Sequence, residues 1–228
     1  MNLHLKSLTA GVAALLLMSG IFATQALAAA PLARIVVAKS GGNYTTITAA
    51  LNAITPSATK PYVIEVWPGV YTENVVLKSY VHLKGSGREV TTIQNSTSFG
   101  TVITATNLTN VEISGFTING TGSTTGIRMV NTKATVADST ISNHGSGIAI
   151  ESNSAATVTG NNVLGNKYEG IMVYGAFATI TGNVVSGNGS GAGYDSSGIY
   201  CERFGPGFVT SRATDRTRCK ASSGSGKW

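Results

Sequence analysis

Three stretches of the chain begin alike: residues 134–141 read ATVADSTI, residues 156–163 read ATVTGNNV, and residues 178–185 read ATITGNVV. Their starts are 22 residues apart. Each stretch alternates apolar residues with small or polar ones, which is typical of a strand with one buried face. Each then reaches a pair of turn residues. A repeat of this length, with short strands separated by turns, predicts a β-solenoid whose stacked coils share one apolar interior.

Asparagines recur within the repeat. Asn161 and Asn183 follow the turn glycines, and a second set lies a few residues further on, at Asn143, Asn166 and Asn188. In stacked coils, equivalent residues lie about 4.8 Å apart, the spacing of neighbouring strands. We therefore expect the amides of Asn161 and Asn183 to hydrogen-bond along the stack as a ladder.

A Gly-Ile pair marks another strand of each coil, at Gly126, Gly147, Gly170 and Gly198. Upstream of the repeats, residues 45–54 have the spacing of an amphipathic helix with Thr45 or Thr46 as N-cap, and we expect this helix to cover the first coil. Residues 68–75 read PGVYTENV. Here the sequence predicts a structural turn, with Tyr71 packed inside and Glu73 accepting backbone hydrogen bonds.

These motifs resemble a known family. The repeats are similar to those of pectin-lyase-like right-handed parallel β-helix proteins and of periplasmic NosD-like proteins, over residues 35–204. The PGxYxE turn and the Gly-rich ending of residues 81–87 resemble the N-terminal part of pectinesterases. The resemblance implies an all-β fold, a single-stranded right-handed parallel β-helix of about six coils with an N-terminal capping helix, and one domain at residues 29–204.

The N-terminus has the pattern of a secretory signal peptide at residues 1–28. Lys6 precedes an apolar run at residues 8–22, and Ala26-Leu27-Ala28 fits an A-x-A cleavage site. The run is short for a membrane span and is interrupted at Ser19 and Gly20. We therefore expect a secreted or periplasmic protein with no membrane association after cleavage.

Charge is concentrated at the C-terminal end. The chain of 228 residues has a net charge of +6, but residues 29–200 are nearly neutral, so the sequence does not predict nucleic-acid binding. Residues 205–228 lack strand or helix periodicity and are expected to form an irregular tail. Such an uncapped last coil could self-associate. Cys201 and Cys219 could form a disulfide or stay unpaired.

The outward face of the Gly-Ile strands is the candidate site. If their isoleucines point inward, alternation turns two columns outward: Arg128, Ala149, Met172 and Tyr200, then Val130, Glu151, Tyr174 and Glu202. The loops before these strands add His144, Lys167, Tyr168, Glu169 and Asp195. Such a surface could bind sugar through Arg128, Tyr174, Glu151, Lys167 and Tyr168. Glu151, Glu169 and His144 are weak catalytic candidates, and Glu151 with Glu169 could act as acid and base. The alternative is a solvated face with scattered charges.

The resemblance does not supply a complete catalytic set. The two aspartates of pectinesterases align near Ser146 and with Gly170, and no segment matches their GRPW-like motif. Asp138 and Asp195 are too isolated for the clustered aspartates of pectate lyases. The three histidines show no zinc, copper or haem spacing, so no cofactor and no metal are predicted. The leading interpretation is a protein that associates with polysaccharide or cell-wall glycan. The other is a pectinesterase-like or lyase/epimerase-type enzyme on uronic-acid polysaccharide, with or without truncation at its C-terminus.

Overall fold

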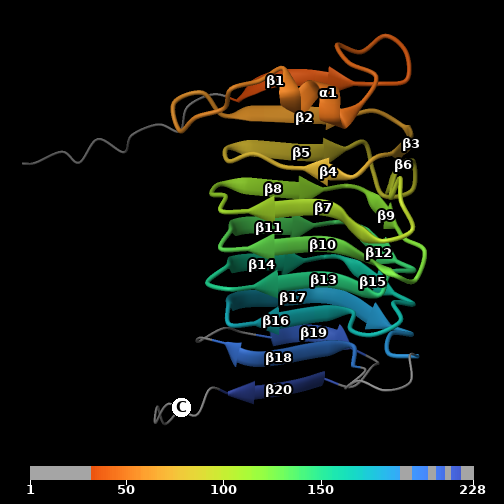
Figure 1. Ribbon diagram of the computed structural model, residues 1–228, viewed down its shortest axis with the longest axis vertical. Coiled ribbons are helices and arrows are strands. Elements are labelled where there is room, and N and C mark those ends of the chain that lie inside the picture. Colours follow the sequence, from red (N-terminus) through yellow and green to blue (C-terminus); the bar gives the residue numbers. More distant parts are fainter. Residues whose placement is uncertain (1–31, 191–196, 205–208, 214–216, 222–228) are drawn as a thin grey trace, which may run out of the picture.

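The computed structural model describes residues 32–190, 197–204, 209–213 and 217–221. Parallel strands form three walls that stack coil by coil along one axis (Figure 1). The first wall contains β1 (Ala33–Val37), β2 (Tyr62–Val66), β5 (Val81–Gly85), β8 (Val111–Ser114), β11 (Lys133–Ala137), β14 (Ala155–Thr159) and the first half of β17 (Phe177–Ser186). The second wall contains β3 (Gly69–Thr72), β6 (Thr91–Gln94), β9 (Thr117–Asn119), β12 (Thr140–Ser142), β15 (Asn162–Leu164) and the second half of β17.

The third wall contains β4 (Val75–Val76), β7 (Gly100–Thr106), β10 (Thr124–Val130), β13 (Ser146–Glu151), β16 (Ile171–Tyr174), β18 (Ile199–Phe204) and β20 (Thr217–Ala221). The solenoid has about five full turns, against the six expected from the sequence. At the N-terminal end, β1 and the short helix α1 (Ile47–Asn52) take the place of a complete coil. The parallel β-helix predicted from the repeat is therefore confirmed, with one turn fewer.

Helix α1 covers the first coil, as the sequence predicted, although it is shorter than residues 45–54. Its N-cap is Thr46, whose hydroxyl accepts a hydrogen bond of 3.2 Å from the Ala49 amide. The Glu73 carboxylate accepts from the amides of Ile47, at 2.9 Å, and Thr48, at 2.8 Å. The PGVYTENV turn thus holds the start of the helix, because its Glu73 satisfies two amides that have no partner within the helix.

The Gly-Ile pairs are explained by close packing between coils. Ile127, Ile148, Ile171 and Ile199 are in register and fully buried, so they form one column of the core. The glycines before the first three of these isoleucines, Gly126, Gly147 and Gly170, each lie against the backbone of the next coil. A Cβ at Gly147 would lie 2.4 Å from the carbonyl oxygen of Gly170. Any larger residue there would push the coils apart, so the repeat requires glycine.

Buried asparagine ladders connect the coils at two corners. Asn161 Nδ2 donates to Asn183 Oδ1 at 3.0 Å, which confirms the predicted ladder. At the second corner, Asn166 Nδ2 donates to Asn188 Oδ1 at 2.8 Å. The sequence groups Asn143 with Asn166 and Asn188 by its place in the repeat, but Asn143 is not part of this second ladder. His144 occupies the position, because its amide donates to Asn166 Oδ1 at 3.0 Å, whereas Asn143 is exposed with a positive φ of 61°.

The C-terminal part differs from the expected irregular tail in two segments. Strand β19 (Val209–Ala213) pairs with β17, and β20 pairs with β18 in parallel. Cys201 is disulfide-bonded, and the other cysteine of the chain, Cys219, is its register partner on the neighbouring strand. The rest of residues 205–228 and the expected signal peptide lie outside the described residues. In the described part of the chain, no helix has the length and apolarity needed to cross a membrane.

Candidate functional site on the third wall

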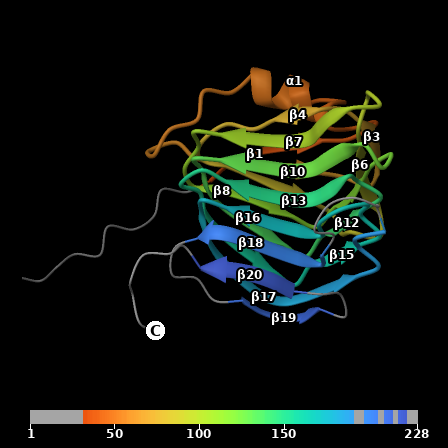
Figure 2. The same ribbon diagram turned by 60° about the horizontal axis from the view of Figure 1, so that its bottom comes forward.

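Strands β10, β13, β16 and β18 lie side by side in the third wall (Figure 2), and their pairing aligns the residues of the two predicted columns. The parallel register aligns Arg128 with Ala149, Ala149 with Met172, and Met172 with Tyr200. It also aligns Val130 with Glu151, Glu151 with Tyr174, and Tyr174 with Glu202. The prediction that the isoleucines point inward therefore placed these outward residues correctly.

Arg128 and Glu151 form a bidentate ion pair across two coils. Arg128 Nε donates to Glu151 Oε1 at 3.1 Å, and Nη2 donates to Oε2 at 2.6 Å. The two residues are diagonal neighbours, and Ala149, which is in register with Arg128, is only 2% exposed. The hydrogen bonds to Glu151 raise the pKa of Arg128, and the charge of the carboxylate adds to this. The planar pair thus presents a rigid polar surface, with guanidinium donors left over for a ligand.

Tyr174 lies on the next strand beside this pair. It is in register with Glu151, and it is 40% exposed. Met172 is half-buried next to Ala149. On β18, the Tyr200 hydroxyl donates to the Glu202 carboxylate. At the ends of the strands, the third wall therefore combines an exposed aromatic ring with oriented charged groups.

A second group of predicted site residues lies at the starts of the same strands. Lys167 Nζ lies 5.2 Å from the centre of the Tyr168 ring. The Lys167 amide donates to the His144 carbonyl at 2.8 Å, so the loop before β16 stacks on the loop before β13. Glu169 Oε2 accepts a hydrogen bond of 2.9 Å from the Ser146 hydroxyl. Ser146, which the sequence analysis considered only as the counterpart of an aspartate, is therefore the partner of Glu169.

Glu151 and Glu169 do not come together as an acid–base pair. Glu151 is the last residue of β13 and is bound to Arg128, whereas Glu169 is bound to Ser146, the first residue of β13. Five residues of extended strand span about 16 Å. Carboxyl groups that cleave glycosides are roughly 5–9.5 Å apart. The two carboxylates therefore mark opposite ends of the surface.

His144 was predicted to lie in the surface site, but the structure places it in the interior. Its side chain is fully buried. Nε2 lies 3.1 Å from the Ile118 carbonyl oxygen, which can only accept, so Nε2 carries the proton. Nδ1 then accepts from the Thr124 hydroxyl at 2.9 Å. Burial lowers the pKa of His144 to about 4, and the ring serves the interior instead of the outer face.

Asp195 lies outside the described residues, so its expected place in the loop before β18 stays a prediction. The sequence analysis also overlooked a shallow groove on the first wall, which is lined by Lys133 and Phe177. Both residues lie immediately before the inward alanines that open the repeat. Because these positions precede the pattern, the alternation gave no reason to examine them.

The comparisons with known proteins agree with this fold. Residues 64–203, more than half of the chain, match the family described as NosD, periplasmic copper-binding protein. The chain belongs to this family. Over 65 residues it is also 49% identical to a pectinesterase of Aspergillus aculeatus, a stretch that covers 27% of the chain and 20% of that enzyme. The chain thus matches only about a fifth of this relative.

Solved structures of similar fold include pectin methylesterases and a viral protein. A pectin methylesterase D178A mutant in complex with a hexasaccharide gives a TM-score of 0.61 at 16% identity, covering 81% of this chain and 66% of that one. Pectin methylesterase PemA of Erwinia chrysanthemi gives 0.51 at 17% identity, covering 66% and 54%. ORF18 of Geobacillus virus E2 gives 0.57 at 16% identity, covering 81% and 41%. At these identities the likeness concerns the fold alone.

The described residues do not fit a copper site. They bring no group of three or more His, Cys, Asp or Glu side chains together. Both ring nitrogens of His144 are engaged, and Cys201 is disulfide-bonded. His82 is paired with Glu112 at 3.5 Å on the first wall. In the part of the chain that the structure describes, no set of ligands is therefore assembled for the copper ion that the family's description mentions.

Proposed function

We propose that this NosD-family protein binds polysaccharide along the outward face of the third wall. The observation that carries the proposal is the exposed Tyr174 ring beside the Arg128–Glu151 pair. An aromatic face stacks on the apolar face of a pyranose ring, and the guanidinium and carboxylate groups can bond its hydroxyls. Because Glu151 leaves some Arg128 N–H groups unused, Arg128 can also bind a uronate carboxylate.

The second group, Lys167, Tyr168 and Glu169, extends this surface to the starts of the strands. It also combines an aromatic ring with charged groups, and it lies about 16 Å from the first, one strand length away. Two such groups on one sheet suit an extended chain of several sugars better than a single sugar. One of the fold neighbours is a pectin methylesterase bound to a hexasaccharide, which supports the same ligand class.

The place of action follows from the family. The family is described as periplasmic, and the apolar run after Lys6 with its A-x-A site supports export by a signal peptide. In this setting the protein would meet envelope or cell-wall glycans. We propose binding without turnover, because Glu151 and Glu169 are each bound to another side chain and stand far apart.

A pectinesterase-type activity is the second candidate. It is favoured by the identity of 49% over 65 residues with a pectinesterase. Against it, the first of the two aspartates of pectinesterases aligns near Ser146 and the second with Gly170, and neither place has an aspartate in this chain. Methanol release from methylated pectin distinguishes the two candidates. Turnover that disappears in a Glu169→Gln variant would favour the enzyme, whereas retention on pectin without methanol release would favour the binding protein.

Affinity electrophoresis in gels containing polygalacturonate or alginate tests the binding proposal. Arg128→Ala and Tyr174→Ala should each migrate faster than the wild type, because each removes one ligand contact while thermal stability is unchanged. Lys60→Gln is the control, since Lys60 is an exposed cation beside Tyr62 near the N-terminal cap. Equal retention of the wild type and the Arg128→Ala/Tyr174→Ala double variant would refute the proposed surface.

A further inference from the structure

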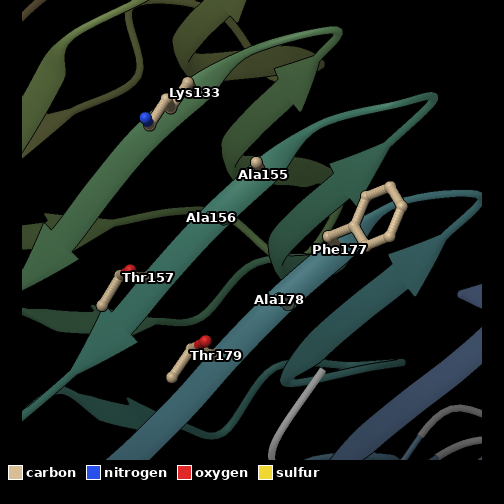
Figure 3. Close-up of a pocket in the computed structure, with 7 residues that line it drawn as sticks. All are labelled: Lys133, Ala155, Ala156, Thr157, Phe177, Ala178 and Thr179. Carbon is tan, nitrogen blue, oxygen red and sulfur yellow. The ribbon is translucent and has the colours of Figure 1, made fainter. Parts of the chain in front are cut away.

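A shallow groove crosses the outward face of the first wall, away from the surface proposed above (Figure 3). It has a volume of about 180 Å³ and spans β11, β14 and β17. The register aligns Lys133 with Ala155 and Ala155 with Phe177. Lys133 and Phe177 are thus two strand spacings apart, about 9.6 Å, with only the Ala155 methyl group between them. The small alanine creates the hollow between two long side chains.

The side chains of the groove are exposed and chemically distinct. Phe177 is 46% exposed, so a large apolar ring faces solvent at one edge. Lys133 is exposed at the other edge, and it forms no ion pair with any residue that the structure describes. Along the strands, Thr157 and Thr179 add hydroxyl groups at aligned positions. One face therefore offers an aromatic ring, a free cation and a short row of hydroxyls.

A second hollow lies on the other side of Lys133. It has a volume of about 120 Å³ and extends from Asn110 to Ala155, with Thr135 and Thr157 beside it. The two hollows share Lys133, Ala155 and Thr157, and the strands that line them shift by one coil, about 4.8 Å, from β11, β14 and β17 to β8, β11 and β14. This step is close to the length that one pyranose residue adds to an extended chain. The hollows therefore have the spacing of two consecutive sugar subsites along the solenoid axis.

We propose that this groove is a second glycan site, which takes an acidic oligosaccharide lying along the axis. One sugar ring packs over Ala155 against Phe177, and Lys133 pairs with a uronate carboxylate between the two hollows. The Thr157 and Thr179 hydroxyls bond the sugar hydroxyls. The site uses the same ligand class as the proposed function but different residues on a different wall, so either site can fail without the other.

The test is an NMR titration of the full chain with tetragalacturonate, observing the methyl groups of selectively labelled alanine. We expect the Ala155 methyl signal to shift, because Ala155 is the floor of the groove. The fully methyl-esterified tetrasaccharide should bind more weakly, since it lacks the charge that Lys133 pairs with. The Arg128→Ala/Tyr174→Ala double variant should keep the Ala155 shift, because those residues lie on the third wall.

Two substitutions distinguish specific binding in the groove from nonspecific attraction of an acidic ligand to the surface. Lys133→Gln should weaken binding at the groove about threefold, as expected when an exposed ion pair is lost. Ala155→Leu fills the floor and should abolish the saturable shifts of the Ala156 and Ala178 methyl signals, because these two residues line the same groove. Lys60→Gln, which removes an equal charge elsewhere, should leave the groove affinity unchanged. An unshifted Ala155 methyl signal, or equal affinities of wild type, Lys133→Gln and Ala155→Leu, would overturn the proposal.

Discussion

His144 gives the protein a specific dependence of stability on pH. The ring is fully buried as the neutral tautomer, with Nε2 donating to Ile118 and Nδ1 accepting from Thr124. Burial is the main cause that lowers its pKa to about 4, and the hydrogen bond to the Ile118 carbonyl offsets only part of this. Protonation would place a charge in the dry interior and remove the acceptor that the Thr124 hydroxyl uses.

The sign of the effect follows from proton binding. In the unfolded chain His144 has its ordinary pKa of about 6.5, so between pH 6.5 and 4 the unfolded state binds more protons than the folded state. The contribution is fully present above pH 6.5 and is lost as the pH falls towards 4. A pKa lowered from 6.5 to about 4 corresponds to about 3 kcal/mol of unfolding free energy.

His144→Asn isolates this contribution, because residues 166 and 188 of the same ladder are already asparagines. The variant will lose some stability at pH 7, since the smaller side chain leaves space beside Gly120 and Gly126. The free energy of unfolding should be measured with urea at several pH values between 4 and 8. Between pH 8 and pH 4 it should fall by about 3 kcal/mol more in the wild type than in the variant. His82→Asn, at a partly exposed histidine, is the control. Parallel pH profiles for the wild type and His144→Asn would refute the reasoning.

Three further predictions concern the frame of the solenoid. Ile171→Asp places a carboxylate in the apolar column and should cost several kcal/mol; a soluble variant with a cooperative thermal transition would contradict the inward assignment. Gly147→Ala brings a Cβ to 2.4 Å from the Gly170 carbonyl oxygen and should cost about 1–3 kcal/mol in urea unfolding, whereas an unchanged midpoint would show that the coils can separate freely. Glu73→Gln leaves helix α1 without its carboxylate acceptor and should speed amide hydrogen exchange in residues 47–52; unchanged exchange rates there would mean that other contacts hold the helix.

The sequence predicted the parts of the structure that depend on strand alternation and on the repeat. Alternation around Ile127, Ile148 and Ile171 was enough to place Arg128, Glu151 and Tyr174 on one outward face. The helix before Pro56 followed from capping rules, and Glu73 was expected to accept backbone hydrogen bonds at a corner, although not from the start of the helix. These features are local, or they repeat with the period of the coil, so a single sequence contains the information.

Other features depend on the exact stacking of loops, which the alternation does not determine. Asn143 was grouped with Asn166 and Asn188 because it is an asparagine, although His144 lies 22 residues before Asn166 and holds the position in the ladder. His144 was among the surface candidates because it lies in the loop before β13, and its place in a loop does not show that its ring is buried. The separation of Glu151 and Glu169 was also missed, because nearness in sequence to one strand says nothing about which end of it a side chain occupies. The strands β19 and β20 lack a clear apolar alternation, so pairing with β17 and β18 could not be read from them.

The central claim is that polysaccharide lies along the outward face of the third wall. Backbone NMR titration of the wild-type protein with hexagalacturonate tests it most directly, because each amide reports its own surroundings. The account predicts saturable shifts in β10, β13 and β16, strongest near Arg128, Glu151 and Tyr174, with further shifts in the loop that contains Lys167 and Tyr168. Saturable binding that leaves these amides unshifted would contradict the claim, and so would the absence of any binding.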